Sequence, residues 1–291
     1  MTSADSAVCR EMYRRLYKTR PLSLGLFKGL ITLALLPALS ALFLVRLLAF
    51  CFFNAAYLVL PRYLWRSLLR SDAFHRLILF LTVGIFLRTP GFDGGSGLRS
   101  RLIVMNHHGV QDVFLFQLFE RMGVSRLVVS FPPDFYTRMR RWFFFFDHDF
   151  AVVSALERRK VVRAGPDDVT MVFPEGAGKK GPFVLKFQPA IFRFYEEVAP
   201  VAVSFRSAIP LLDVYGVDLP WHKCACFLLL ILTPWTVVTV RQIPPLRIDR
   251  RHPVEAAGRC RDLIAKAAGY CTLDFLFEQS VFDACVAPSR R

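Results

Sequence analysis

A histidine and an aspartate stand close together in the string N-H-H-G-V-Q-D at residues 106–112. The string follows an apolar, strand-like run and precedes a helical pattern, and a strand-to-helix turn of this kind is a common place for a site. Histidine can take a proton from a hydroxyl near neutral pH, and a carboxylate on its other ring nitrogen fixes its tautomer. Five helical residues turn about 500°, so we expect His107 at the turn and Asp112 in the first helical turn, reaching back. The alternative is a helix N-terminal carboxylate beside an incidental imidazole, and it is favoured when this string is taken alone.

A second string with chemical potential is V-F-P-E-G-A-G-K-K-G at residues 172–181. It reads as an apolar strand followed by a tight turn that carries Glu175. Its glycines leave backbone N–H groups open to an anionic ligand, and Lys179, Lys180 and Lys186 supply positive charge. The spacing does not match a nucleotide-binding P-loop, because no G-K-[ST] follows in register. When this string is taken alone, a hairpin turn with solvated lysines is the favoured interpretation.

Together the two strings resemble the glycerophospholipid acyltransferase superfamily, of the lysophosphatidic acid acyltransferase type. Asn106, His107 and Asp112 match its N-H-x4-D block, and residues 173–176 match its F-P-E-G block, which begins 66 positions after His107. The L-K-F run at 185–187 and the V-A-P-V run at 198–201 resemble its later blocks. The resemblance covers about residues 100–250, and two blocks in the right order are more specific than either alone.

The resemblance implies transfer of an acyl group from acyl-CoA to a lysophospholipid or glycerol-phosphate hydroxyl, without a covalent acyl-enzyme. It makes His107 the general base and Asp112 its orienting partner. His108 offers an H-x3-D alternative, but His107 has the Asn-His register of the block. Acyl-CoA is then a co-substrate, and we expect no cofactor and no metal. The substrate-binding residues that we expect are Asn106, Phe173, Pro174, Glu175, Gly176, Lys179, Lys180 and Lys186.

The sequence departs from the family pattern in two places. The second block normally carries an arginine that holds the acceptor phosphate, and residues 141–159 contain no clear match. The Thr-Arg that usually follows F-P-E-G is replaced by Ala177 and Gly178, so Lys179 or Lys180 would have to substitute electrostatically, without the bidentate geometry of arginine. The D-H-D string at 147–149 is interpreted as a polar turn rather than a metal site.

Composition points to a lipid environment. Residues of the AVILMFWYC set make up 54% of the 291 residues, and 38 Lys and Arg against 23 Asp and Glu give a net charge of +15. The apolar content excludes a disordered chain. The positive charge favours an anionic membrane surface or phosphate- and CoA-type ligands, and we find no basic stripe with stacking aromatics that would indicate nucleic acid. The seven scattered cysteines indicate reduced thiols facing the cytosol, with no function assigned.

Residues 29–60 carry one formal charge, Arg46, and are long enough to enter a bilayer. Pro37 and Arg46 divide the segment, and both flanks are basic, which favours cytoplasmic ends. We therefore expect a membrane hairpin, with a single tilted helix as the alternative. An interfacial helix is expected over 62–88. A run at 224–240 is interrupted by Pro234 and is interpreted as a surface or membrane-touching segment before a core strand.

The remaining pattern predicts an α/β fold, a mixed sheet flanked by helices, because short β-branched runs alternate with helical stretches. Expected strands cover 102–105, 127–130, 169–173, 201–205 and 236–240, and expected helices cover 109–122, 189–197 and 253–269. The predicted organisation is a basic cytosolic N-terminus (1–28), a membrane hairpin (29–60), an interfacial helix and linker (61–100), an acyltransferase-like α/β domain (101–270) and a C-terminal helix and tail (271–291).

The last third, with P-W-T-V-V-T-V-R-Q-I-P-P-L at 234–246, resembles the acyltransferase-like domain of the ancient ubiquitous protein family. That resemblance implies the endoplasmic reticulum membrane, lipid droplets or both, with the domain facing the cytosol. The sequence ends at Arg291, and we expect no ubiquitin-binding tail. The two resemblances leave two functions open: an acyltransferase, or a catalytically weak acyltransferase-like anchor or scaffold.

Overall fold

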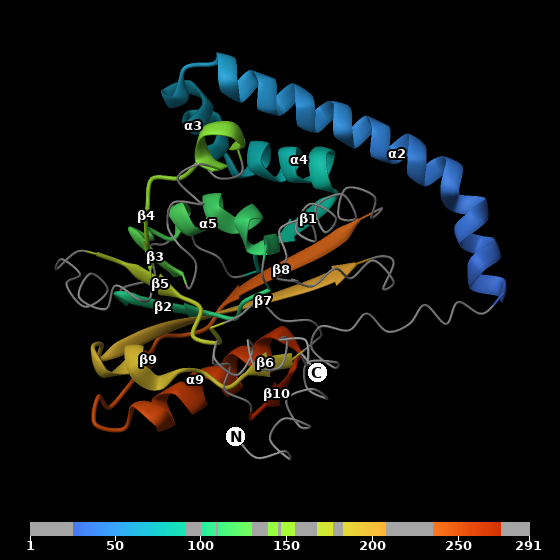
Figure 1. The fold of residues 1–291 in the computed structure, drawn as a ribbon. Coiled ribbons are helices and arrows are strands. Elements are labelled where there is room, and N and C mark those ends of the chain that lie inside the picture. The colour runs from blue at the N-terminus through green and yellow to red at the C-terminus, as the bar shows by residue number, and fades with distance from the viewer. Residues whose placement is uncertain are drawn as a thin grey trace, which may run out of the picture.

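The computed structural model describes residues 26–90, 100–108, 110–129, 139–144, 147–154, 168–176, 183–207 and 235–274. In these residues a mixed, mostly parallel sheet lies between two layers of helices (Figure 1). The predicted α/β class with a mixed sheet flanked by helices is therefore confirmed. Along the sheet the strands run in the order β1 (Ile85–Arg88), β8 (Thr236–Gln242), β7 (Glu197–Ser207), β2 (Leu102–Met105), β5 (Thr170–Val172), β3 (Arg126–Val129) and β4 (Ala151–Ser154).

Strand β2 lies at the centre of this sheet and separates two hydrophobic cores. It pairs in parallel with β5 and β7, and all four of its side chains are buried. Ile103 and Met105 join the core beneath the N-terminal helices, whereas Leu102 and Val104 join the core on the other face. A strand covered on both faces reads as a continuous apolar run, which is why the sequence marks it clearly.

The face opposite α2 and α4 is covered mainly by α9 (Pro253–Ala268). Its buried positions include Ala256, Ala257 and Cys260, and these small side chains let the helix approach the sheet closely. The helix starts with a proline and ends at Gly269, whose φ of 71° is the left-handed conformation of a helix C-cap. The prediction of a helix over 253–269 is confirmed. Beyond it, the short β6 (Phe183–Leu185) and β10 (Cys271–Leu273) pair with each other, and β9 (Leu246–Arg247) pairs with β7.

The other two expected helices are shorter than predicted. The segment 109–122 contains a 3-10 helix, η1 (Val110–Leu115), followed by α5 (Phe116–Arg121). The segment 189–197 contains only η3 (Pro189–Arg193), and Glu197 already begins β7. Apolar periodicity alone does not separate a helix from a strand where a helical turn runs directly into a buried strand.

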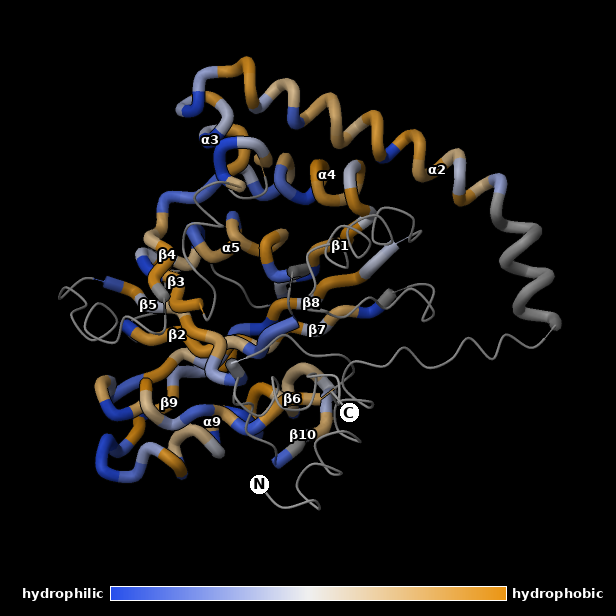
Figure 2. The backbone as a smooth tube through the Cα atoms, viewed as in Figure 1, coloured by the Kyte–Doolittle hydropathy of each residue, from blue (hydrophilic) through white to orange (hydrophobic). Residues whose placement is uncertain are grey.

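The expected hairpin across residues 29–60 is corrected to one continuous helix, α2 (Leu26–Val59). Pro37 lies inside the helix. A proline removes one intrahelical hydrogen bond and can kink a helix, but it does not have to reverse the chain. Arg46 is 3% exposed, and its guanidinium lies against Gly84. The chain changes direction only after Val59, at Pro61. Pro37–Val59 is long and apolar enough to cross a membrane, by length and composition alone, and most of the described part of α2 is apolar in Figure 2.

The expected interfacial helix over 62–88 consists of two helices and a strand. These are α3 (Arg62–Arg70), α4 (Asp72–Val83) and β1. The hydroxyl of Ser71 accepts a hydrogen bond from Phe74 N and starts α4, and Gly84 ends it with φ 67°. The sheet thus takes its first strand from the stretch that was assigned to a helix and linker.

Several expectations fall on residues outside the described ranges. These are the basic N-terminus up to residue 25, the apolar run at 224–234, the strand residue Ser130 and the C-terminal helix from residue 275 onward. Residues 271–273, predicted to start that helix, form β10. Among the described cysteines, Cys51 and Cys260 are free thiols.

Candidate active site

Asn106 holds the turn that follows β2 against the neighbouring strand β7. Its amide nitrogen donates to Val203 O and its amide oxygen accepts from Val203 N, both at 2.8 Å. Val203 lies two residues beyond Val201, the last β7 partner in the β2 register. The side chain therefore continues the sheet pairing where the backbone of β2 leaves the sheet. Asn106 is fully buried, and its two hydrogen bonds position the turn. Its expected part in substrate binding stays a prediction.

His107 and Asp112 form the predicted pair. His107 Nδ1 lies 2.6 Å from Asp112 Oδ2, and the same carboxylate oxygen accepts a hydrogen bond from His108 N at 2.9 Å. Asp112 lies in the first turn of η1, so the expectation that it reaches back to a histidine at the turn is confirmed. A carboxylate on Nδ1 places the imidazole proton there and leaves Nε2 as the basic nitrogen.

The exposure of the two side chains differs in a useful way. The side chain of Asp112 is 4% exposed, whereas that of His107 is 17% exposed. The buried carboxylate of Asp112 fixes the orientation of the His107 ring, and part of that ring is still exposed to solvent. The arrangement can remove a proton from a group that approaches from outside.

Glu175 connects this turn to the second string. It is fully buried, and its two carboxylate oxygens accept hydrogen bonds from His107 N at 2.8 Å and from Leu185 N at 2.9 Å. Hydrogen bonds from backbone N–H groups to a carboxylate are stronger than those between neutral groups. Glu175 thus fixes the backbone of the general-base candidate to β6. The sequence predicted that the two strings act together, and this bond is their physical link.

The rest of the F-P-E-G turn packs around the same point. The ring of Phe173 lies 4.6 Å from the ring of His107, and Gly176 N donates to Phe173 O to close the turn. Gly176 has φ 76°, a conformation that favours glycine. Pro174 is buried, and its carbonyl accepts a hydrogen bond from Gln188 N. Of the four residues, Phe173 is the one placed beside the imidazole.

His108 occupies a different environment from His107. It is fully buried, and its Nδ1 lies 3.8 Å from Asp112 Oδ1, beyond hydrogen-bond distance. Its Nε2 lies 3.4 Å from the hydroxyl of Tyr270, and that hydroxyl accepts a hydrogen bond from Phe205 N. The geometry favours His107 over His108 as the base. Tyr270, which lies 162 positions from His108 in the sequence, was not singled out before, and no local pattern marks it.

Of the basic residues, Lys186 is exposed and directly follows Leu185, whose N–H binds Glu175. Lys179 and Lys180 lie outside the described residues, so their part in the site stays a prediction.

The D-H-D string is a set of ion-pair and packing contacts away from this turn. Asp147 binds Arg66 and Arg140, and the ring of His148 stacks on Phe150 with the planes 4° apart. Burial lowers the pKa of His148 to about 4, helped by the charge of Arg140. Across the described part of the chain, no three His, Cys, Asp or Glu side chains gather in a way that could hold a metal ion.

Comparison with known proteins finds likeness in structure rather than in sequence. No family model and no curated protein sequence matches the chain. Among solved structures, the chain is similar to the crystal structure of the 1-acyl-sn-glycerophosphate (LPA) acyltransferase, PlsC, from Thermotoga maritima. The identity is 17%, the TM-score is 0.42, and the match covers 76% of this chain and 97% of that chain. At this TM-score the likeness carries no argument about function, which has to come from the geometry of the site.

Proposed function

We propose that this protein is a membrane-attached acyltransferase that moves a fatty acyl group from acyl-CoA to the hydroxyl of a lysophospholipid or glycerol phosphate. The observation that carries the proposal is the 2.6 Å contact between His107 Nδ1 and a buried Asp112, at the end of the central strand and with the imidazole partly exposed. The family pattern N-H-x4-D and F-P-E-G supports it, because Glu175 joins the two strings by a hydrogen bond.

The proposed reaction uses one imidazole as both base and acid. Asp112 accepts a hydrogen bond from Nδ1–H and keeps that proton on Nδ1, so Nε2 takes the proton of the acceptor hydroxyl as the hydroxyl oxygen attacks the thioester carbonyl. The tetrahedral intermediate collapses, the new C–O ester bond remains and the C–S bond breaks. The proton on Nε2 then passes to the departing CoA sulfur. Neither an acyl-enzyme nor a metal is required by this sequence of steps.

The acceptor phosphate is proposed to lie on the basic side of the F-P-E-G turn. Lys186 is exposed one residue beyond the N–H that Glu175 binds, and Lys179 and Lys180 are proposed to add charge there. Lysine offers a point charge rather than a bidentate fork, so head-group selectivity is expected to be broader than with an arginine.

Membrane attachment is proposed to occur through α2. Its outer side chains are exposed and apolar, including Leu44, Leu48, Phe52 and Val59. The opposite side, with Phe50, Phe53 and Tyr57, packs on the domain core. We propose that α2 rests lengthwise on the endoplasmic reticulum membrane or a lipid droplet, with the domain in the cytosol. Tags at both ends should then be equally accessible after selective permeabilisation of the plasma membrane, and a protected C-terminus would contradict this.

The activity is tested by release of CoA thiol from acyl-CoA with a panel of lysophospholipids and glycerol phosphate, using the full chain in lipid nanodiscs. His107→Ala is expected to lower kcat by about 10²–10⁴-fold, the usual contribution of a positioned acid–base group. The matched control is His252→Ala, because His252 also pairs with an aspartate, Asp249, but is exposed. An unchanged rate in His107→Ala would reject the site, and an inactive native protein would reject the enzyme.

One observation favours a second function, a catalytically weak acyltransferase-like anchor or scaffold. Residues 141–159 contain no clear match to the family's phosphate-holding arginine, and Arg140, just before them, is bound to Asp147. An anchor would keep the fold and its membrane attachment and lack turnover, so the same assay separates the two.

A further inference from the structure

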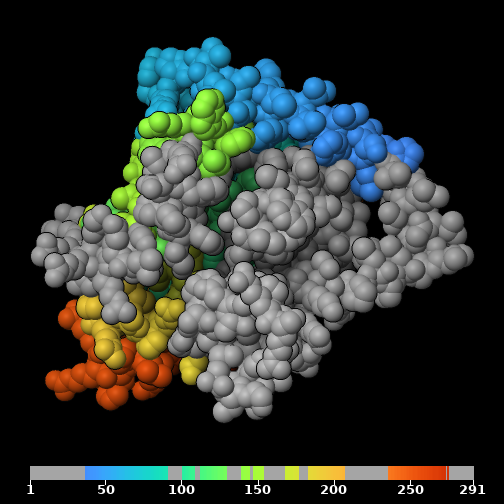
Figure 3. All heavy atoms as spheres, viewed as in Figure 1, coloured from blue at the N-terminus to red at the C-terminus, as the bar shows by residue number. Residues whose placement is uncertain are grey.

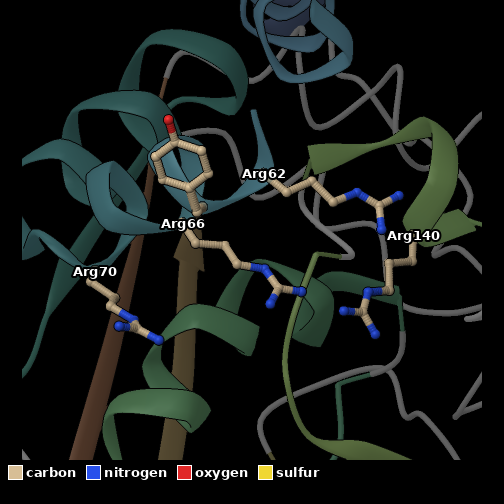
Figure 4. Close-up of a pocket in the computed structure, with 5 residues that line it drawn as sticks. Arg62, Arg66, Arg70 and Arg140 are labelled. Carbon is tan, nitrogen blue, oxygen red and sulfur yellow. The ribbon is translucent and has the colours of Figure 1, made fainter. Parts of the chain in front are cut away.

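A cavity of about 470 Å³ lies on the surface beside α3 and is lined by four arginines and Tyr63 (Figure 4). Arg62, Arg66 and Arg70 come from α3 at four-residue spacing, which puts them on one face of the helix. Arg140 comes from the segment 139–142. In Figure 4 the side chains of Arg62, Arg66 and Arg140 reach toward the same space from these two segments. The described chain therefore gathers guanidinium groups around one opening.

Two carboxylates organise these arginines without neutralising them. Asp147 is fully buried and accepts hydrogen bonds from Arg66 Nη2 at 3.1 Å and Arg140 Nε at 3.3 Å. Asp149, half exposed, contacts Arg66 and lies 3.9 Å from Arg70. Glu120, which accepts a hydrogen bond from Asp149 N and interacts with Arg66, is a third carboxylate beside the cavity. Four guanidinium groups against three carboxylates leave an excess of one positive charge.

Arg62 is the least constrained of the four, because no ion pair joins it to any residue that the structure describes. A cavity with fixed arginines and a spare guanidinium is complementary to a phosphate group.

The position of the cavity indicates where that phosphate comes from. Arg62 follows the last residue of α2, Val59, by three positions, and Val59 is 82% exposed. Helix α2 lies along α4 and continues to α3 along one edge of the molecule (Figures 1 and 3). The arginine side of α3 thus begins next to the exposed end of α2. Tyr63, 77% exposed, is the kind of aromatic side chain that is enriched at membrane interfaces.

We propose that this arginine cavity binds the phosphate of an anionic phospholipid in the membrane on which α2 rests. The inference rests on the membrane attachment proposed above but not on catalysis. The apolar side of α2 supplies attachment to any bilayer, and the cavity supplies preference for anionic lipid. Together they fix the rotation of the domain about α2, and hence the direction in which the His107 turn faces the bilayer.

The test is co-flotation of the full chain with vesicles of phosphatidylcholine alone and of phosphatidylcholine with about 20 mol % phosphatidate or phosphatidylserine. Arg62→Gln/Arg70→Gln removes two exposed charges and spares Arg66 and Arg140, which hold Asp147. We expect partitioning onto anionic vesicles to fall about tenfold, since each basic residue at an anionic surface contributes several-fold. Binding to neutral vesicles should stay unchanged, and Arg62→Lys/Arg70→Lys should retain most of the anionic preference.

The matched control is Arg247→Gln/Arg251→Gln, which removes the same charge from exposed positions beside β9 and α9, across the sheet from α3 (Figure 1). It should change partitioning less than twofold, because screening removes interactions beyond about 8 Å at physiological salt. If both double variants lost anionic-vesicle binding equally, the cavity would not be a specific site and only the general positive charge of the protein would matter. If excess soluble glycerol phosphate abolished the preference for anionic vesicles, the cavity would be assigned to a free phosphate, and the proposal that it binds a phospholipid would be rejected. Binding to neutral vesicles without anionic preference would overturn this inference alone, and absence of any vesicle binding would overturn the attachment as well.

Discussion

Two turns of this molecule contain nearly the same hydrogen-bonded group. At the end of β2, Asp112 accepts hydrogen bonds from His107 Nδ1 and from the backbone N–H of His108. Before α9, Asp249 lies 2.9 Å from His252 Nδ1 and accepts a hydrogen bond from the backbone N–H of Arg251. Residue types and bonding are shared, so neither feature by itself identifies a catalytic pair.

The two turns differ in enclosure and in what holds the backbone. The side chains of Asp249 and His252 are 57% and 66% exposed, whereas those of Asp112 and His107 are 4% and 17% exposed. The His107 turn is also fixed by Glu175, which receives its backbone N–H. Water screens the exposed Asp249–His252 pair. The Asp112–His107 pair lies at low local dielectric, where a hydrogen bond is stronger and keeps its direction. The comparison teaches that burial by the surrounding sheet gives a fixed direction to a contact that is common at protein surfaces.

The largest expected difference between the turns is in activity. Asp112→Asn removes the acceptor that keeps the proton on Nδ1, so the proton can move to Nε2 and block the base. We expect kcat for acyl transfer to fall about 10²–10⁴-fold, and Asp249→Asn to leave it unchanged. Turnover of acyl-CoA at saturating acceptor is the measurement. Equal rates for the two variants would mean that enclosure confers nothing on the pair.

The next effect concerns the backbone support. Glu175→Gln keeps the size of the side chain but turns one oxygen into an N–H donor, which must then face a backbone N–H of His107 or Leu185. We expect unfolding free energy to fall by about 2–3 kcal/mol, the cost of an unsatisfied buried polar contact. Glu255→Gln, on the exposed start of α9, is the control and should change stability by less than about 0.5 kcal/mol. Denaturant unfolding measures both, and a stable Glu175→Gln variant would show that the bridge is dispensable.

The two turns also show how far the sequence predicts this molecule. The His107–Asp112 pair spans five positions, so spacing and a strand-to-helix transition indicated it, and the resemblance favoured it over an incidental imidazole. The bond from Glu175 to His107 N spans 68 positions, and only the resemblance placed the two strings together. Tyr270 reaches His108 through the packing of α9 and β10, for which no local signal exists.

The predictions that were wrong for residues 29–88 failed for a different reason. Pro37 and Arg46 interrupt the apolar run in the sequence, and a hairpin was predicted from that interruption. In the fold the helix tolerates Pro37, and Arg46 packs against Gly84, a residue 38 positions away in the sequence. The strand β1 was missed because its register with β8 depends on where α4 ends. These features depend on tertiary packing, which cannot be predicted from the distribution of charged residues along the sequence.

The smallest expected effect uses the buried histidines against the exposed one. Burial lowers the pKa of His75 to about 3 and that of His148 to about 4, below the ordinary value of 6.5. An unfolded chain takes up these protons first as the pH falls, so the stability that neutral His148 contributes is complete above about pH 7 and is lost progressively toward pH 4. Between pH 7 and pH 5 the loss is about 2 kcal/mol for each buried histidine.

His148→Gln keeps a donor for the carbonyl of Phe150, which lies 3.0 Å from His148 Nδ1, and removes the titration. The fall in unfolding free energy from pH 7 to pH 5 should therefore be about 2 kcal/mol smaller than in the native chain. His252→Gln makes the same exchange at a position that is 66% exposed and is the control for the substitution itself. Urea unfolding at the two pH values measures the difference. Identical slopes in the native chain and His148→Gln would mean that His148 is protonated in the fold, and enclosure would then fail to separate the histidines of this protein.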